Sequence, residues 1–183
     1  MADEEITDAG TPEMTAVCQA VGELILWANM IDRQLNKALI AALALPQHAM
    51  IEPVVAQLDA RPKAELLKKR AKFITNVAWR NGIKNWVERT EKVNSNRNYV
   101  AHHQIRIRDR KIAFHSDQLG KVLEKLTMTD EVIEPQADKG VADVLDWIEH
   151  AKKVYEEGTM VLENLTRFRA KAAEALGAEA ASK

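Results

Sequence analysis

A long helical repeat of apolar residues near the start of the chain restricts the fold more than any other feature. Between Pro12 and Pro46, apolar side chains recur at every third or fourth position. The members of this repeat are Val17, Val21, Leu24, Ala28, Ile31, Leu35, Leu39 and Ala42. Such spacing predicts one helix of about 30 residues with a single apolar face. A helix of this length can form one wall of a bundle, so the segment predicts a mainly helical protein.

The next part of the chain predicts a short connecting helix and then a lysine-rich helix. Residues 49–58 form a short apolar segment that Pro53 interrupts, which predicts the connecting helix. Asp59 and Pro62 then open a longer helix. Its expected core-facing residues are Leu66, Leu67, Phe73 and Ile74. Its expected solvent-facing residues are Lys68, Lys69, Arg70 and Lys72.

Two more helices and a hairpin complete the predicted architecture. Asn81-Gly82 interrupts the chain, and we expect Ile83 to begin a helix that ends near His103. Helical spacing then gives way to strict alternation, which predicts a two-stranded hairpin with one apolar side. The residues of that side are Ile105, Ile107, Ile112 and Phe114. Helical periodicity returns over residues 138–176. The sequence therefore predicts an all-α antiparallel bundle of four main helices, with a short helix and a small β-hairpin.

Length and composition are consistent with a single domain. The chain has 183 residues, of which 46% are hydrophobic, enough for one core but too few for two domains of ordinary size. We expect one domain over residues 11–176. Residues 1–10 should be disordered and residues 177–183 frayed. Residues 116–137 have no pattern from which a fold can be predicted.

The net charge of -1 hides a strong asymmetry along the chain. Residues 1–60 carry 2 basic and 9 acidic side chains, residues 61–111 carry 15 and 4, and residues 112–183 carry 9 and 14. The three net charges are therefore -7, +11 and -5. One interpretation is a basic surface that binds an anionic partner. The other, equally open at this point, is that acidic helices neutralise the basic ones within the monomer.

The sequence predicts a cytoplasmic protein without a membrane anchor or a cofactor. The first ten residues are acidic and do not resemble a signal peptide, and no apolar run reaches about 18 residues. The single cysteine, Cys18, excludes an internal disulfide and is expected to lie in the core. The sequence contains no cysteine pair, metal-ligand spacing or glycine-rich phosphate loop, so neither a metal nor a cofactor is expected.

The helix predicted from Ile83 carries an arginine within its apolar stripe. At 100° per residue, the apolar positions occupy an arc of about 140°, and Arg97 falls in the middle of it. Burying an unpaired guanidinium is costly, so Arg97 must face a carboxylate, a water-filled cleft or another subunit. Asn98 and His102 are four residues apart and share one edge beside the stripe. A cation, an amide and an imidazole are therefore placed to meet one small anion.

The stretch from Arg97 to His102 resembles the R-N-x-x-x-H signature of the HEPN superfamily. These are small helical-bundle proteins that include RNA-cleaving toxins and antiviral nucleases of bacteria. The order of elements is also similar over about residues 15–170: a long first helix, a lysine-rich helix, the signature near the end of the next helix, a hairpin and a long closing helix. The chain thus resembles a HEPN-like bacterial or phage protein.

The resemblance implies a metal-independent endoribonuclease that cleaves RNA through its own 2′-hydroxyl, at a composite site formed by a homodimer. Histidine exchanges protons near neutral pH, and arginine offers a planar fork that matches phosphate oxygens. We therefore assign His102 as general acid/base, Arg97 as phosphate clamp and Asn98 as an orienting residue. The expected RNA-binding residues are Lys68, Lys69, Arg70, Arg106, Arg108 and Lys111. The toxin type also implies a neutralising antitoxin protein as a candidate partner.

Other interpretations of the same residues stay open. Arg97 can pair with an acid of its own chain, such as Asp32 or Glu23, and His102 can be a satisfied histidine at a helix C-terminus. In that case the chain is a non-catalytic RNA- or nucleotide-binding protein, or a scaffold. The four tryptophans are expected to be core or interface anchors rather than base-stacking residues. They are Trp27, Trp79, Trp86 and Trp147.

Overall fold

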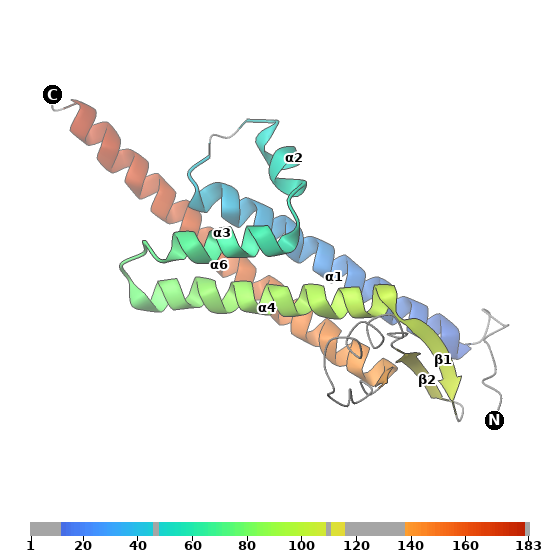
Figure 1. Ribbon diagram of the computed structural model, residues 1–183. Coiled ribbons are helices and arrows are strands. Elements are labelled where there is room, and N and C mark those ends of the chain that lie inside the picture. Colours follow the sequence, from blue (N-terminus) through green and yellow to red (C-terminus); the bar gives the residue numbers. More distant parts are fainter. Residues whose placement is uncertain (1–11, 46–47, 109–110, 116–137, 182–183) are drawn as a thin grey trace, which may run out of the picture.

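The computed structural model describes residues 12–45, 48–108, 111–115 and 138–181 (Figure 1). For residues 106–108, 111, 115 and 171–181 it describes the backbone alone. The helices are α1 (Pro12–Ala42), α2 (Ile51–Ala56), α3 (Ala60–Ala71), α4 (Val77–His102) and α6 (Val141–Ala181). The strands are β1 (Gln104–Arg108), β2 (Lys111–His115) and β3 (Lys139–Gly140). The predicted all-α bundle with a small hairpin is therefore confirmed. Residues 1–11, 116–137 and 182–183 lie outside the described part.

Helix α4 runs antiparallel to α6, while α1 and α6 run side by side in the same direction (Figure 1). The first relation is shown by two contacts, because Tyr99 packs on Trp147 and Trp79 packs on Phe168, twenty residues earlier on α4 and twenty-one later on α6. The second follows from two contacts in the same order along both helices: Glu23 lies 3.2 Å from Lys152 Nζ, and the Gln34 amide nitrogen donates to the Thr159 hydroxyl at 3.1 Å. Helix α2 connects the end of α1 to α3. Helix α3 starts beside the middle of α1, where Lys63 pairs with Asp32.

The core lies where α1, α4 and α6 meet. Its fully buried large side chains include Leu24, Ile31, Leu35, Leu67, Ile83 and Trp86. Gly158 of α6 marks the closest approach, since a Cβ atom built there would lie 2.9 Å from the Trp86 ring and would overlap the Gln34 amide. The indole nitrogen of Trp86 donates to the carbonyl oxygen of Val154 at 3.0 Å. A glycine is therefore required for the three helices to pack this closely.

Two arginines from other helices bind the C-terminal end of α1. This helix has no basic residue in its last turn. The Arg70 Nε donates to the carbonyl oxygen of Ala42 at 2.9 Å, and the Arg169 Nη2 donates to that of Leu45 at 2.8 Å. Both arginines satisfy carbonyls that the helix end leaves free, and their charge also opposes the helix dipole. Ala44 follows the helix with a φ of 51°, in the left-handed region usually taken by glycine.

The predicted hairpin is present, with Ile105 opposite Phe114 and Ile107 opposite Ile112. The third strand, β3, was not predicted; it adds two residues to the free edge of β2. It could not be predicted from the sequence, because two residues are too few for a periodic pattern. The sheet lies at the C-terminal end of α4 and at the start of α6 (Figure 1).

Several predictions about individual positions were wrong. Helix α4 begins at Val77 rather than Ile83, because the Asn76 side chain accepts a hydrogen bond from the backbone nitrogen of Trp79 and caps it earlier. Cys18 is exposed rather than buried. Phe73 lies beyond the end of α3 and is 77% exposed instead of facing the core. Leu66 is also exposed, whereas Leu67 is buried as predicted.

One helix in the described part, α1, is long and apolar enough to cross a membrane by length and composition. A core helix of a soluble protein meets the same criterion. In this bundle α1 packs against α3, α4 and α6 and buries one face that includes Leu24, Ile31 and Leu35. The core accounts for part of its apolar character, since 33% of the apolar stretch is buried, while Leu26 and Met30 of the same helix are exposed.

Candidate functional site

The predicted signature residues occupy the last two turns of α4. The stripe that was expected to be buried is buried at Ile83, Trp86, Val87, Thr90, Val93 and Val100, although Ala101 is exposed. Arg97 lies four residues after Val93 and three before Val100 on the same face, and it is half-buried. Asn98 and His102 are exposed. The cation thus lies at the edge of the core, while the amide and the imidazole reach solvent.

Arg97 has no polar partner within the described part of the chain. Its Nε is out of contact with water and forms no hydrogen bond there, and its guanidinium forms no ion pair. The two acids considered as partners are both engaged elsewhere. Asp32 accepts from Lys63 Nζ at 3.0 Å, and Glu23 lies 3.2 Å from Lys152 Nζ. With both acids paired elsewhere, the half-buried guanidinium of Arg97 remains available to an external anion.

A packed aromatic cluster fixes the junction between α4 and the sheet. The rings of Tyr99 and His103 stack with centroids 3.7 Å apart, and the Tyr99 ring meets Trp147 of α6 edge-on at 5.6 Å. The Tyr99 hydroxyl donates to the carbonyl oxygen of Phe114 in β2 at 3.1 Å. Burial raises the pKa of Tyr99, and the charge of Asp138 raises it further, so the phenol stays a neutral donor.

His103 belongs to this cluster, although it was not among the residues predicted for the site. Its Nδ1 lies 2.6 Å from the carbonyl oxygen of Tyr99, which can only accept, so Nδ1 carries a proton and donates. Its Nε2 is buried and has no partner in the described part. Tyr99 thus packs against rings of its own chain. The cluster holds the backbone that carries His102 in place.

The predicted RNA-binding residues have different environments. Lys68 is half-buried and its Nζ lies 2.5 Å from Glu91, and Arg70 is bound to the end of α1. Lys69 is exposed and forms no ion pair with the described residues. Glu91 precedes His102 by eleven residues on α4, so Lys68 lies about 16 Å from His102 along the helix axis. Their role in RNA binding stays a prediction. The side chains of Arg106, Arg108 and Lys111 lie outside the described part.

A second histidine faces α4 from the neighbouring helix. His150 of α6 is half-buried, and its Nε2 is out of contact with water without a hydrogen-bond partner in the described part. Burial lowers the pKa of His150, and the cations Lys92 and Arg89 lower it further, while Glu157 acts in the opposite direction. His150 is therefore neutral at neutral pH. His150 was not predicted from the sequence, because its surroundings depend on how α4 and α6 pack.

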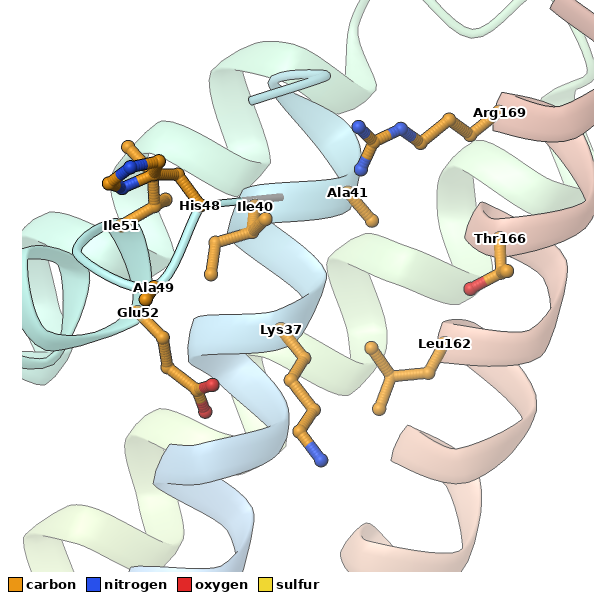
Figure 2. A pocket seen from close by; sticks show the side chains of 10 residues that line it. All are labelled: Lys37, Ile40, Ala41, His48, Ala49, Ile51, Glu52, Leu162, Thr166 and Arg169. Carbon is orange, nitrogen blue, oxygen red and sulfur yellow. The ribbon is translucent and has the colours of Figure 1, made fainter. Parts of the chain in front are cut away.

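Two hollows lie away from the signature. A cavity of about 530 Å³ lies between the end of α1, α2 and α6, where Lys37, Glu52 and Arg169 line it around the side chains of Ile40 and Leu162 (Figure 2). A larger groove of about 1050 Å³ runs between the first half of α4 and α6. Among the described residues, no group of three or more His, Cys, Asp or Glu side chains is placed to hold a metal ion.

No protein-family model matches this sequence, and the searches of curated proteins and of solved structures gave no significant match.

Proposed function

We propose that this protein is a metal-independent endoribonuclease of toxin or defence type, which cleaves RNA at a composite site formed by two copies of the chain. The observation that carries the proposal is the unpaired guanidinium of Arg97. A half-buried cation without a carboxylate costs free energy unless an anion occupies the site during function. Arginine binds phosphate oxygens in a bidentate manner, so a phosphodiester is the anion that fits best.

The chemistry needs few groups. The 2′-oxygen of one ribose attacks the adjacent phosphorus, the bond to the 5′-oxygen breaks, and a 2′,3′-cyclic phosphate and a 5′-hydroxyl result. One group must take the proton of the 2′-hydroxyl, and one must give a proton to the leaving oxygen. The exposed imidazole of His102 can do either, and the two-fold pair supplies two such imidazoles. The guanidinium of Arg97 stabilises the charge that grows on the phosphate.

Asn98 has an orienting role in this proposal. It is exposed and lies one residue after Arg97 and four before His102, so its amide shares a face with the imidazole. An amide there can hold the imidazole or a phosphate oxygen through its two donors and its oxygen. The packed ring pair Tyr99 and His103 keeps the helix end rigid, which such a site requires.

The test is RNA cleavage by purified protein in the presence of a chelator. We expect His102→Ala to lower the rate by about 10² to 10⁴, which is the usual contribution of general acid/base catalysis. Arg97→Ala should lower it by about 10² to 10³, which is the usual cost of losing one group that stabilises the developing charge. His48→Ala is the matched control, because His48 is exposed and distant from α4 in the chain. Circular dichroism should show the same helix content in all variants. Cleavage by both site variants at the parent rate would disprove the proposal.

A composite site adds a second requirement. The specific activity should fall on dilution below the dissociation constant of the dimer, because a single copy then holds half of the site. Sedimentation velocity over the same concentrations gives the dimer fraction independently. An activity that is constant while the dimer dissociates would restrict the proposal to a site within one copy.

A further inference from the structure

The groove between α4 and α6 has an unusual lining for an apolar hollow. Its floor is formed by buried apolar side chains such as Ile83 and Trp86. Its walls carry two aromatic rings, three asparagines and two arginines. These residues are Trp79, Phe168, Asn76, Asn85, Asn164, Arg89 and Arg167. Flat rings beside amide and guanidinium groups are the combination with which proteins hold an unpaired nucleobase and its phosphate.

The ring of Phe168 is available for stacking. Phe168 is 56% exposed although it lies on a helix that contributes much of the core. Its ring contact with Trp79 is tilted, at a centroid distance of 5.3 Å and an interplanar angle of 58°. One broad face of the Phe168 ring therefore has no aromatic partner within the described part. Stacking on an exposed ring is tolerant of base identity, because every base has a flat face.

Polar groups without partners lie next to these rings. The Trp79 Nε1 is out of contact with water and donates to no described residue. The side-chain amides of Asn85 and Asn164 are exposed and form no hydrogen bond with the described residues. Arg167 has only a loose partner, since its Nη2 lies 4.0 Å from Glu163 and both side chains are exposed. The groove thus offers donors and acceptors for a base edge and one cation for a phosphate.

The position of the groove relates it to Arg97. Trp79 and Arg97 are eighteen residues apart on α4, which is five full turns, so both lie on the same line of the helix. The distance between them along the axis is about 27 Å. At about 3.4 Å per stacked nucleotide, about eight nucleotides cover that distance. A single strand whose phosphodiester lies at Arg97 therefore reaches the groove with the nucleotide about eight positions away.

We propose that the α4–α6 groove is a nucleotide-binding subsite for single-stranded RNA, in which a base stacks on Phe168 beside Trp79 and its phosphate contacts Arg167. This inference rests on the proposed ribonuclease function and specifies its substrate as unpaired RNA. A protein partner fits the groove less well, because amides and arginines, rather than aliphatic side chains, surround its two rings; Met160 is its one strongly exposed aliphatic residue in the described part.

The experiment measures binding without cleavage. An RNA oligomer of about twelve nucleotides with a terminal fluorophore is titrated with the full-length His102→Ala variant, and anisotropy gives the dissociation constant. We expect the added change Phe168→Ala to weaken binding by about 5- to 100-fold, since that is the range for loss of one stacked base. Phe73→Ala is the matched control, because Phe73 is an even more exposed phenylalanine that does not line this groove, and it should change affinity less than twofold.

Each outcome separates this inference from the proposed function. Cleavage by the parent together with unchanged affinity of Phe168→Ala would overturn the subsite and leave the ribonuclease standing. Phe168-dependent binding without cleavage by the parent would support the subsite and overturn the ribonuclease. Equal affinity for AMP or UMP and for the oligomer would assign the groove to free nucleotides, and equal affinity for a duplex would exclude base stacking; both overturn the inference. So would self-association that Phe168→Ala abolishes while RNA binding stays unchanged, since the groove would then be a protein interface.

Discussion

The ammonium group of Lys63 lies 3.0 Å from both carboxylate oxygens of Asp32, although the two residues belong to different helices. Lys63 is 1% exposed and Asp32 is 34% exposed, so the lysine depends on this carboxylate for its charge. The pair also removes Asp32 as a partner for Arg97. The Lys63–Asp32 ion pair stabilises the fold and at the same time leaves Arg97 without this carboxylate as a partner.

The unequal burial of this pair predicts unequal effects of breaking it. Asp32→Asn leaves a charged ammonium buried without a counterion, which should lower the free energy of unfolding by about 3–5 kcal/mol. Lys63→Met should cost less, because the methionine fills the same volume and the remaining carboxylate keeps contact with water. Urea denaturation of both variants and of the double variant measures the difference. A larger loss for Lys63→Met than for Asp32→Asn would contradict the prediction.

The main helices could be predicted from the sequence because their signal is local. The repeat from Val17 to Ala42 depends only on which residues follow one another, and α1 ends at Ala42, the last residue of that repeat. Cys18 was misplaced because it lies one residue from the buried Val17, and the periodicity alone does not give the width of the buried face. The early start of α4 was missed because Gly82 disfavours a helix locally, whereas the cap at Asn76 and packing outweigh that cost.

The site could be predicted only in part. The position of Arg97 in the apolar stripe follows from the spacing within one helix, and the structure places it there. Whether Arg97 has a partner depends on where Asp32 and Glu23 lie, which is decided by the packing of α3 and α6 against α1. The groove that holds Phe168 likewise arises between two helices far apart in the sequence. Such features have no signature in a single stretch of residues.

A methyl group at Gly158 should destabilise the bundle. In an isolated helix, Gly→Ala stabilises by about 1 kcal/mol. Here the new Cβ would overlap the Gln34 amide and approach the Trp86 ring to 2.9 Å, and overpacking of this kind costs about 1–3 kcal/mol. We expect a net loss of unfolding free energy for Gly158→Ala in chemical denaturation.

Gly82 provides the opposite case within the same protein. It lies in α4, and no atom would lie within 4 Å of an added Cβ. Gly82→Ala should therefore raise the free energy of unfolding by up to about 1 kcal/mol. If Gly158→Ala raises the free energy of unfolding as Gly82→Ala does, the close packing at Gly158 has no energetic consequence.

The left-handed residue at the end of α1 predicts a stabilising substitution. Ala44 has a φ of 51°, and its backbone nitrogen donates to the carbonyl oxygen of Ala41 while that of Leu45 donates to Ile40. This is the hydrogen-bond pattern of a Schellman cap, in which glycine avoids the strain of a Cβ atom. Ala44→Gly should raise the free energy of unfolding by about 1 kcal/mol. Ala101→Gly, at an exposed position within α4, should lower it by a similar amount and serves as the control.

His150 predicts a loss of stability in mild acid. Burial, followed by the charges of Lys92 and Arg89, lowers its pKa in the folded protein below the ordinary value of 6.5. Well above 6.5 the imidazole is neutral in both states and contributes little to the pH dependence. As the pH falls below 6.5, the unfolded chain binds the proton first, so the free energy of unfolding decreases until the folded protein is protonated as well.

His150→Gln should remove this part of the pH dependence, because glutamine does not titrate. Urea denaturation between about pH 7.5 and pH 5 should show a steeper fall for the parent than for the variant, and the difference between the two curves isolates His150 from the other groups that titrate in this range. His102→Gln is the matched control, because it makes the same change at an exposed histidine. Curves of equal slope for the parent and His150→Gln would mean that His150 is solvated in the folded protein, and its neutral form would then have no role in the packing of α4 against α6.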